Sequence, residues 1–355
     1  MHLHNDLSFI IETLNNSGGV FEHFRGKHLF LTGATELFGK WLLETFVYAN
    51  QTLNLQLKIS ALSRDPEKFA KKFPHLANTS CIDWYQGDIK NFQSAATVPS
   101  HPNFIIHAAT EASEKINNQN PLEMLDTIII GTRRILEYAC SCNNTKDNQT
   151  GLESVLLISS GAIYGKQPPN ISHIPEEYLG GPTVHDAKSA YSEGKRTAEL
   201  LAAIYIREHD LPIKIARCFA FVGPHLPLDA HFAVGNFIGD LLAGRTIVIK
   251  GDGTPLRSYL YMADLVVWLL KILIDGKNNV PYNVGSDQAI SIKSLAELVI
   301  SVGKKNIKNM GLNKLNKEHA NNQNSIEILG TKIAKKDLEQ YIPSINKAKK
   351  ELGLE

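Results

Sequence analysis

A chain of 355 residues is long enough for one large α/β domain and a smaller lobe. Its 37 basic and 36 acidic residues give a formal net charge of +1, which predicts neither a nucleic-acid partner nor an acidic cation-binding surface. The four cysteines lack metal-ligand spacing, no apolar run approaches the ~20 residues of a membrane span, and the start lacks a secretory signal, so we expect a cytoplasmic protein without a metal site or membrane attachment.

Residues 1–27 form an N-terminal extension before the first predicted strand. Apolar residues recur in it at helical spacing from Leu7 to Leu14, which predicts a short helix. We expect this helix to pack on the smaller lobe or at a contact between subunits.

From His28 onward, predicted strands and helices alternate. The apolar runs that predict strands are Leu29–Leu31, Lys58–Leu62, Asn103–His107, Val155–Ile158 and Ile213–Ala216. The periodic segments that predict helices include Gly39–Tyr48, Pro121–Cys140 and Ala190–Glu208. This alternation predicts a parallel sheet that is covered by helices on both faces.

The first strand is followed by a turn with two glycines, Thr32-Gly33-Ala34-Thr35-Glu36-Leu37-Phe38-Gly39, and then by a helix. Backbone N–H groups and the positive end of the helix dipole bind anions at such a helix start. A strand, a glycine turn and a helix in this order predict a dinucleotide-binding site with the pyrophosphate at the turn.

The end of the second strand bears on the choice between NAD and NADP. An acid there binds the ribose hydroxyls of NAD, whereas a basic residue accommodates the 2′-phosphate of NADP. This strand ends with Ser63 and Arg64, which can both bind a phosphate. Asp65 stands before Pro66 and is expected to start the next helix. The pattern favours NADP(H), and NAD remains possible if Arg64 only stacks on the adenine.

A serine after the fourth predicted strand, Ser160, precedes a Tyr-x-x-x-Lys pattern formed by Tyr191 and Lys195. On a helix, this spacing puts the phenol and the ammonium on one face. A nearby ammonium favours the phenolate and should lower the pKa of the tyrosine, and the serine hydroxyl can bind a reacting oxygen. The three residues predict interconversion of an alcohol and a ketone with a separate hydride carrier.

These motifs, in this order, resemble the extended short-chain dehydrogenase/reductases that act on nucleotide sugars as epimerases, dehydratases or reductases. The resemblance extends from about His28 to Gly353. Further segments that match the family in order are Gly87–Ile89, His107–Ala109, Arg217–Pro224, Gly251–Arg257, Tyr261–Asp264 and Tyr282–Gly285.

The resemblance implies an α/β fold, with a doubly wound parallel-sheet Rossmann domain and a smaller, discontinuous C-terminal substrate lobe. The Rossmann domain would comprise residues 28–220 and 258–285. The lobe would comprise residues 221–257 and 286–355, together with the loop 165–186. The active cleft should lie between them, at the carboxyl ends of the strands.

The resemblance also implies a role for individual residues. Ser160, Tyr191 and Lys195 would be catalytic. The cofactor would contact Tyr191, Lys195, Thr32, Gly33, Thr35, Leu37, Phe38, Gly39, Ser63, Arg64, Asp88, Ile89, His107, Ala108 and Ala109. The nucleotide-diphosphate sugar would contact Ser160, Ala162, Asn236, Val248 and Arg257. The helices Pro121–Cys140 and Ala190–Glu208 resemble the pair that joins two subunits in this family, which implies a homodimer.

The residues after Ser160 narrow the expected reaction. The family's 4,6-dehydratases have Asp-Glu directly after the catalytic Ser or Thr, and its decarboxylases normally have a glutamate here. This chain has Gly161 and Ala162 instead, so an acid and a base for elimination are missing. The remaining possibilities are a keto-sugar reductase, which the Ser63-Arg64 strand end favours, and a 4-epimerase.

Three positions depart from the family pattern and support an alternative to an enzyme, a protein that binds the cofactor without catalysis. Glu36 replaces the middle glycine of the turn, and Ile128 and Ala220 replace two asparagines that the family often has. A protein that binds NADP as a scaffold or sensor, without turnover, would tolerate such losses. The intact Ser160 and Tyr191 favour an enzyme.

Overall fold

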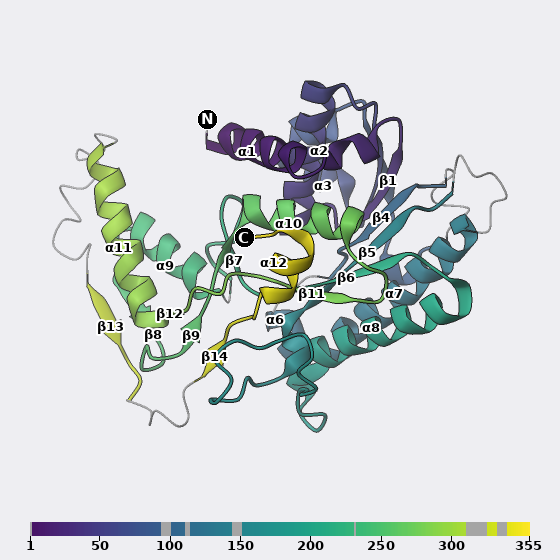
Figure 1. Cartoon of the computed structure of the whole chain (residues 1–355). Coiled ribbons are helices and arrows are strands. Elements are labelled where there is room, and N and C mark those ends of the chain that lie inside the picture. Colours follow the sequence, from purple (N-terminus) through teal and green to yellow (C-terminus); the bar gives the residue numbers. More distant parts are fainter. Residues whose placement is uncertain are drawn as a thin grey trace.

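The computed structural model describes residues 2–93, 101–110, 114–143, 151–230, 232–309, 325–331 and 339–355 (Figure 1). Its centre is a parallel sheet of seven strands in the order β11-β6-β5-β4-β1-β2-β3. The strands are β1 (His28–Thr32), β2 (Lys58–Ser63), β3 (Ile82–Gln86), β4 (Phe104–His107), β5 (Ser154–Ser160), β6 (Ile213–Cys218) and β11 (Pro281–Val284). The chain moves outward from β1 to β3 and returns to β4 on the other side of β1, which is the doubly wound arrangement predicted from the sequence.

Helices cover both faces of this sheet (Figure 1). One face packs against α1 (His2–Asn16), α2 (Leu37–Leu53), α10 (Met262–Asp275) and α12 (Asn346–Leu352). The other face packs against α7 (Pro121–Asn143) and α8 (Ala190–His209). The sequence of the central strand β1 is continuously apolar because both of its faces are buried. Leu29 and Leu31 lie in the core on one face of the sheet, and Phe30 lies in the core on the other.

Short helical segments connect these elements. They are α3 (Pro66–Lys72), α4 (Pro74–Ala77), α6 (Glu114–Gln119) and the 3-10 turns η1 (Val20–Phe24), η2 (Ile89–Asn91), η3 (Gly161–Tyr164) and η4 (Ala187–Ser189). Asp65 starts α3 as predicted, since its Oδ1 accepts a hydrogen bond from the Lys68 backbone N–H at 2.9 Å. In the part of the chain that the structure describes, no helix has the length and apolar character needed to span a membrane.

A second group of elements lies at the carboxyl ends of the strands and has its own core, centred on Phe237, Ile249 and Leu295. It contains α9 (Ala233–Leu242), α11 (Ile292–Asn309), β7 (Phe221–Val222), β8 (Ile247–Ile249), β9 (Leu256–Arg257), β10 (Leu260–Tyr261), β12 (Ile290–Ser291), β13 (Ile326–Ile328) and β14 (Gln340–Tyr341). The domain limits given by the sequence stay a prediction, and residues 310–324 and 332–338 of the expected lobe lie outside the described residues.

The N-terminal helix differs from expectation in its place. Helix α1 packs against α10 and α2 on the large sheet and not on the smaller lobe; the alternative place, a contact between subunits, stays a prediction. Its periodic residues Leu7, Ile10 and Leu14 are buried there. Tyr261 at the start of α10 also donates a hydrogen bond to Asp6 at 2.8 Å. The extension therefore completes the apolar cover of one sheet face.

Candidate active site

The turn between β1 and α2 has two positions that require glycine. Gly33 has a φ of +71°, and a Cβ on it would lie 2.4 Å from the Ala108 carbonyl oxygen. A Cβ on Gly39 would lie 2.2 Å from the Gly33 carbonyl oxygen. These contacts bring the start of α2 close to β1 and to the end of β4, so the backbone of the turn is shaped as a dinucleotide site needs.

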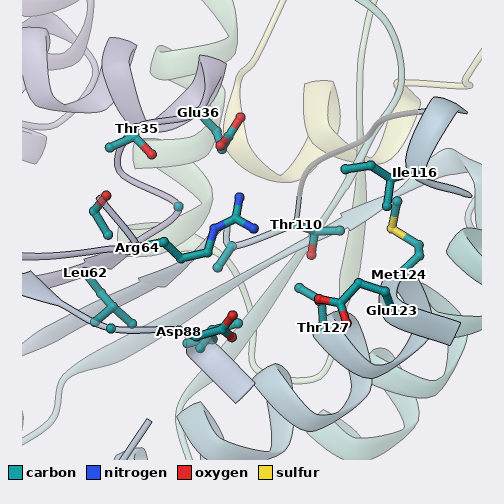
Figure 2. A pocket seen from close by; sticks show the side chains of 15 residues that line it. Thr35, Glu36, Leu62, Arg64, Asp88, Thr110, Ile116, Glu123, Met124 and Thr127 are labelled. Atoms are coloured by element: carbon teal, nitrogen blue, oxygen red, sulfur yellow. The ribbon is translucent and has the colours of Figure 1, made fainter. Parts of the chain in front are cut away.

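A cavity of about 100 Å³ lies beside this turn (Figure 2). Predicted cofactor residues that line it are Gly33, Thr35, Ser63, Arg64, Asp88, Ile89 and Ala109. They come from the turn, from the ends of β2 and β4, and from the segment after β3. Figure 2 shows the Arg64 guanidinium extending into the cavity, between Glu36 and Asp88.

Acidic side chains outnumber basic ones among the described residues that line this first cavity. Among the described residues that line it, Glu36, Asp88 and Glu123 carry carboxylates, and Arg64 carries a guanidinium. Lys90 offsets part of this charge, because its Nζ lies 2.5 Å from a Glu123 carboxylate oxygen. The site therefore combines a phosphate-binding side chain with an acidic surround.

Other predicted cofactor residues lie beneath the turn. His107 is buried at the end of β4, where its ring nitrogens contact Thr32 Oγ1 at 2.8 Å and Thr132 Oγ1 at 3.2 Å. Burial, assisted by the nearby Lys195 charge, lowers the pKa of His107 to about 3. The imidazole is therefore neutral and connects β1, β4 and α7 as a hydrogen-bonded support.

A second cavity, of about 360 Å³, holds the three predicted catalytic residues. Ser160, Tyr191 and Lys195 line it, together with the predicted cofactor residues Leu37 and Phe38. Glu36 and Thr110 line both cavities, so the two cavities meet at these residues. The two cavities are therefore adjacent, with Arg64 lining the first and Tyr191 lining the second.

Lys195 is held near the carboxyl ends of the internal strands β5 and β4. Its Nζ donates hydrogen bonds to the Ile158 carbonyl oxygen at 2.7 Å and to Thr110 Oγ1 at 3.2 Å. Burial lowers the pKa of this lysine to about 8, against the opposing effects of Cys218 and Glu199.

The pKa of Tyr191 corrects the expectation from the sequence. We expected Lys195 to lower it, but burial raises it to about 12, and the Ser160 hydroxyl opposes this only in part. The reason is geometric, since the Lys195 ammonium lies 6.0 Å from the centre of the Tyr191 ring and is bound to Ile158. At neutral pH the phenol is protonated.

Ser160 ends β5, and its Oγ accepts a hydrogen bond from the Ala162 backbone N–H at 3.1 Å. The hydroxyl also interacts with Tyr341, a half-buried tyrosine whose pKa is raised mainly by desolvation. The Tyr341 ring packs on Phe219, with 4.6 Å between ring centres. Sequence analysis missed Tyr341, because it lies on a strand of two residues that no periodicity predicts.

A largely buried ion pair connects α8 and β6. Glu199 and Arg217 approach to 2.7 Å, with each side chain 12% exposed. Ser159 also donates a hydrogen bond to Glu199, and Arg217 donates one to Tyr164 Oη at 2.8 Å. The pair joins α8, β5 and β6 close to Ser160 and Lys195 in the sequence, and we infer that it fixes their relative positions.

The predicted substrate residues are more scattered. Arg257 lies on β9, opposite Tyr341 in β14, and forms a 3.5 Å ion pair with Glu339. Asn236 lies on α9, and Val248 lies on β8 with 38% of its surface exposed. Among the described residues, those lining the second cavity do not include these three. Their roles, and that of Ala162 beside Ser160, stay predictions.

Residues 29–285 match the sequence profile described as the NAD dependent epimerase/dehydratase family. UDP-glucuronic acid decarboxylase 3 from Arabidopsis thaliana is 34% identical over 251 residues, covering 71% of this chain and 64% of that protein. UDP-glucuronic acid decarboxylase 1 from Xenopus tropicalis is 31% identical over 195 residues, covering 55% of this chain and 44% of that protein. The chain thus matches less than two thirds of the length of these relatives.

Solved structures show the same fold at lower identity. UDP-glucose 4-epimerase from Thermotoga maritima, solved with UDP-glucose, has a TM-score of 0.72 and 20% identity, covering 92% of this chain and 93% of that one. dTDP-glucose 4,6-dehydratase from Streptomyces venezuelae, solved with NAD, has a TM-score of 0.71 and 18% identity, covering 92% of this chain and 91% of that one. The family profile spans most of the chain, and both the glycine turn and the cavity with Ser160, Tyr191 and Lys195 lie within the matched residues. The chain is therefore a member of the NAD-dependent epimerase/dehydratase family, the extended short-chain dehydrogenase/reductases that modify nucleotide sugars.

Proposed function

We propose that this protein interconverts a ketone and an alcohol on the sugar of a nucleotide-diphosphate sugar, and that it acts as an NADP(H)-dependent reductase. The main support is the second cavity, in which Ser160, Tyr191 and Lys195 lie together and which meets the first cavity at Glu36 and Thr110. We infer that a dinucleotide occupies both cavities, with the protonated phenol at one end of it.

The proton transfer follows from the states of these side chains. Tyr191 would give its proton to the ketone oxygen, since its pKa of about 12 keeps the phenol protonated at neutral pH. Ser160 would donate a hydrogen bond to the same oxygen. Lys195 would contact the nicotinamide ribose and stabilise the phenolate left on Tyr191. A bound nicotinamide cofactor would supply the hydride.

Elimination chemistry has little support at the two positions after Ser160. A Cβ on Gly161 would lie 2.6 Å from Phe219 Cζ and 2.7 Å from Tyr341 Oη, so these two rings fill the space of a side chain there. Ala162 has no titratable group. The similarity to decarboxylases therefore does not bring decarboxylation to this chain, because the glutamate expected of such enzymes is missing.

The cofactor preference depends on the first cavity. Arg64, which extends into it beside Ser63, supports NADP(H) because a guanidinium binds phosphate well. The carboxylates of Glu36, Asp88 and Glu123 favour NAD, which has no 2′-phosphate. This acidic surround supports a second candidate, a nucleotide-sugar 4-epimerase that retains NAD(P) throughout its cycle.

The reductase proposal is tested with purified protein, NADPH and 4-keto sugars linked to UDP, dTDP, CDP or GDP. Thermal shifts with the four nucleotides would first identify the one that stabilises the fold. We expect stoichiometric NADPH oxidation for each alcohol formed, with no loss of water or carbon dioxide from the sugar. Interconversion of two sugars without net NADPH change would identify the epimerase instead. Cofactor binding without turnover on any sugar would support the scaffold alternative.

A further inference from the structure

The residue before helix α2 is an acid at the junction of the two cavities. Glu36 lines both of them, together with Thr110. Its backbone is extended, with φ of −83° and ψ of 176°, and its side chain makes no capping hydrogen bond to the helix. A dinucleotide that reaches from Arg64 to Tyr191 must therefore pass the Glu36 carboxylate.

The charge at this point opposes the ligand. The start of the 17-residue helix α2 is where the two phosphates of a dinucleotide would bind, since its N–H groups and dipole favour anions. A carboxylate beside two phosphates repels them, and this repulsion is stronger in a cavity than in bulk water. Lys40, one turn along α2, interacts electrostatically with the Glu36 carboxylate, and Arg64 lines the first cavity, so both cations offset part of this negative charge. We therefore expect dinucleotide binding to be weakened and not abolished.

We propose that Glu36 is a built-in weakening element that makes the dinucleotide exchangeable, by placing a negative charge against its pyrophosphate. The benefit of such a weakening element rests on the proposed reductase function. A reductase must release the oxidised cofactor after each turnover, whereas an epimerase restores the cofactor within its cycle and can retain it. A residue that speeds cofactor release therefore suits a reductase and not an epimerase.

The test compares the wild type with Glu36→Gln, which removes the charge and keeps the size, and with Glu36→Gly. Glu67→Gln is the matched control, because Glu67 is an exposed acid on α3 that lines neither cavity. Affinities for NADPH and NADH are measured by calorimetry, and dissociation rates by stopped-flow fluorescence. Adenosine 2′-monophosphate serves as a ligand that lacks the pyrophosphate.

We expect Glu36→Gln to bind both dinucleotides at least about tenfold more tightly than the wild type, mainly through slower dissociation. The gain should shrink as salt screens the repulsion. Adenosine 2′-monophosphate should bind equally to both forms, and Glu67→Gln should match the wild type. Unchanged or weaker dinucleotide binding by Glu36→Gln, or an equal gain for adenosine 2′-monophosphate, would overturn the inference.

The binding measurements need no sugar substrate, so the two proposals can fail separately. If Glu36→Gln tightens binding but the wild type oxidises no NADPH with any keto sugar, the reductase function fails alone. If NADPH is consumed stoichiometrically and Glu36→Gln binds as the wild type does, the role of Glu36 fails alone.

Discussion

Tyr191 and Lys195 show how burial sets the chemistry of single residues in this site. Desolvation raises the pKa of the phenol to about 12 and lowers that of the ammonium to about 8. Both shifts favour the uncharged side chain, as expected away from water. At neutral pH the phenol keeps its proton and Lys195 keeps most of its charge, which is the state that proton donation to a ketone needs.

Replacing Tyr191 by phenylalanine removes the proton donor and keeps the packing of the ring. We expect turnover to fall by roughly 10²–10⁴-fold, measured as NADPH oxidation with the cognate keto sugar. Cofactor affinity should be preserved, because Lys195 and the glycine turn remain. Tyr205→Phe, on the same helix and outside the second cavity, is the control and should retain activity. Near-normal turnover in Tyr191→Phe would contradict its role.

Replacing Lys195 by methionine should abolish activity and yet stabilise the fold at neutral pH. The pKa of Lys195 is about 8, against 10.5 when exposed, and each unit of difference corresponds to about 1.4 kcal/mol. Keeping the buried ammonium charged thus costs about 3 kcal/mol below pH 8. The lost hydrogen bonds to Ile158 and Thr110 offset part of the gain.

The lowered pKa of Lys195 also makes the stability difference between the wild type and Lys195→Met depend on pH. The folded protein loses the Lys195 proton near pH 8, and the unfolded chain loses it near 10.5. The unfolded state therefore binds more protons in this interval, and the stability of the wild type should rise with pH relative to Lys195→Met. Urea unfolding at a series of pH values measures the difference. A difference that stays constant through this interval would contradict the burial argument.

Arg64 tests the cofactor preference at one residue. Arg64→Ala should weaken NADPH binding by about 1–3 kcal/mol, the contribution of a charge-assisted hydrogen bond, and leave NADH binding nearly unchanged. Calorimetry with both cofactors measures the two changes. Arg207, exposed on α8, provides the control Arg207→Ala. An equal loss for NADPH and NADH would show that Arg64 stacks on adenine and does not select the phosphate.

At the scale of elements, apolar runs and turn residues predicted most of the sheet. The five predicted strands correspond to β1, β2, β4, β5 and β6, within two residues at each end. Strand β3 was missed because it lies at the sheet edge, where Asp83 and Gln86 are exposed and no apolar run forms. Strand β11 was recognised as a family signature and not as a strand. Long, buried elements are predictable because burial imposes their pattern.

The ion pair between α8 and β6 gives a prediction at this scale. Glu199→Gln leaves Arg217 buried without its charged partner, which should destabilise the fold by about 3–5 kcal/mol. The half-exposed acid Glu137 on α7 pairs with the exposed Arg133 and Arg134, so Glu137→Gln should cost less than about 1 kcal/mol. Chemical denaturation measures both variants. Similar losses would show that the buried pair does not hold the two elements together.

At the scale of the whole molecule, the site brings together segments that are distant in sequence. Its second cavity combines the turn before α2, the ends of β5 and β6, and the start of α8. The C-terminal segment adds Tyr341, and Asn283 connects it to the rest by donating hydrogen bonds to the carbonyl oxygens of Ile174 and Ser344. Motifs predicted the first group because each has a local pattern. Tyr341 depends on long-range packing, which single-sequence patterns do not record.

The outer face of α7 and α8 gives the last prediction. Leu122, Ile130 and Leu200 are 74%, 37% and 61% exposed on these two adjacent helices. Pairing this face with a second copy would bury the three side chains in a bundle of four helices. We expect a dimer at micromolar concentration in sedimentation velocity.

Leu200→Asp would place a charge in that interface and should yield monomers. Leu298, 50% exposed on α11, provides the matched variant Leu298→Asp, which introduces the same charge away from the face and should remain dimeric. Monomeric wild type at this concentration would exclude the interface. A dimer that survives Leu200→Asp and dissociates in Leu298→Asp would place the contact on the smaller lobe instead.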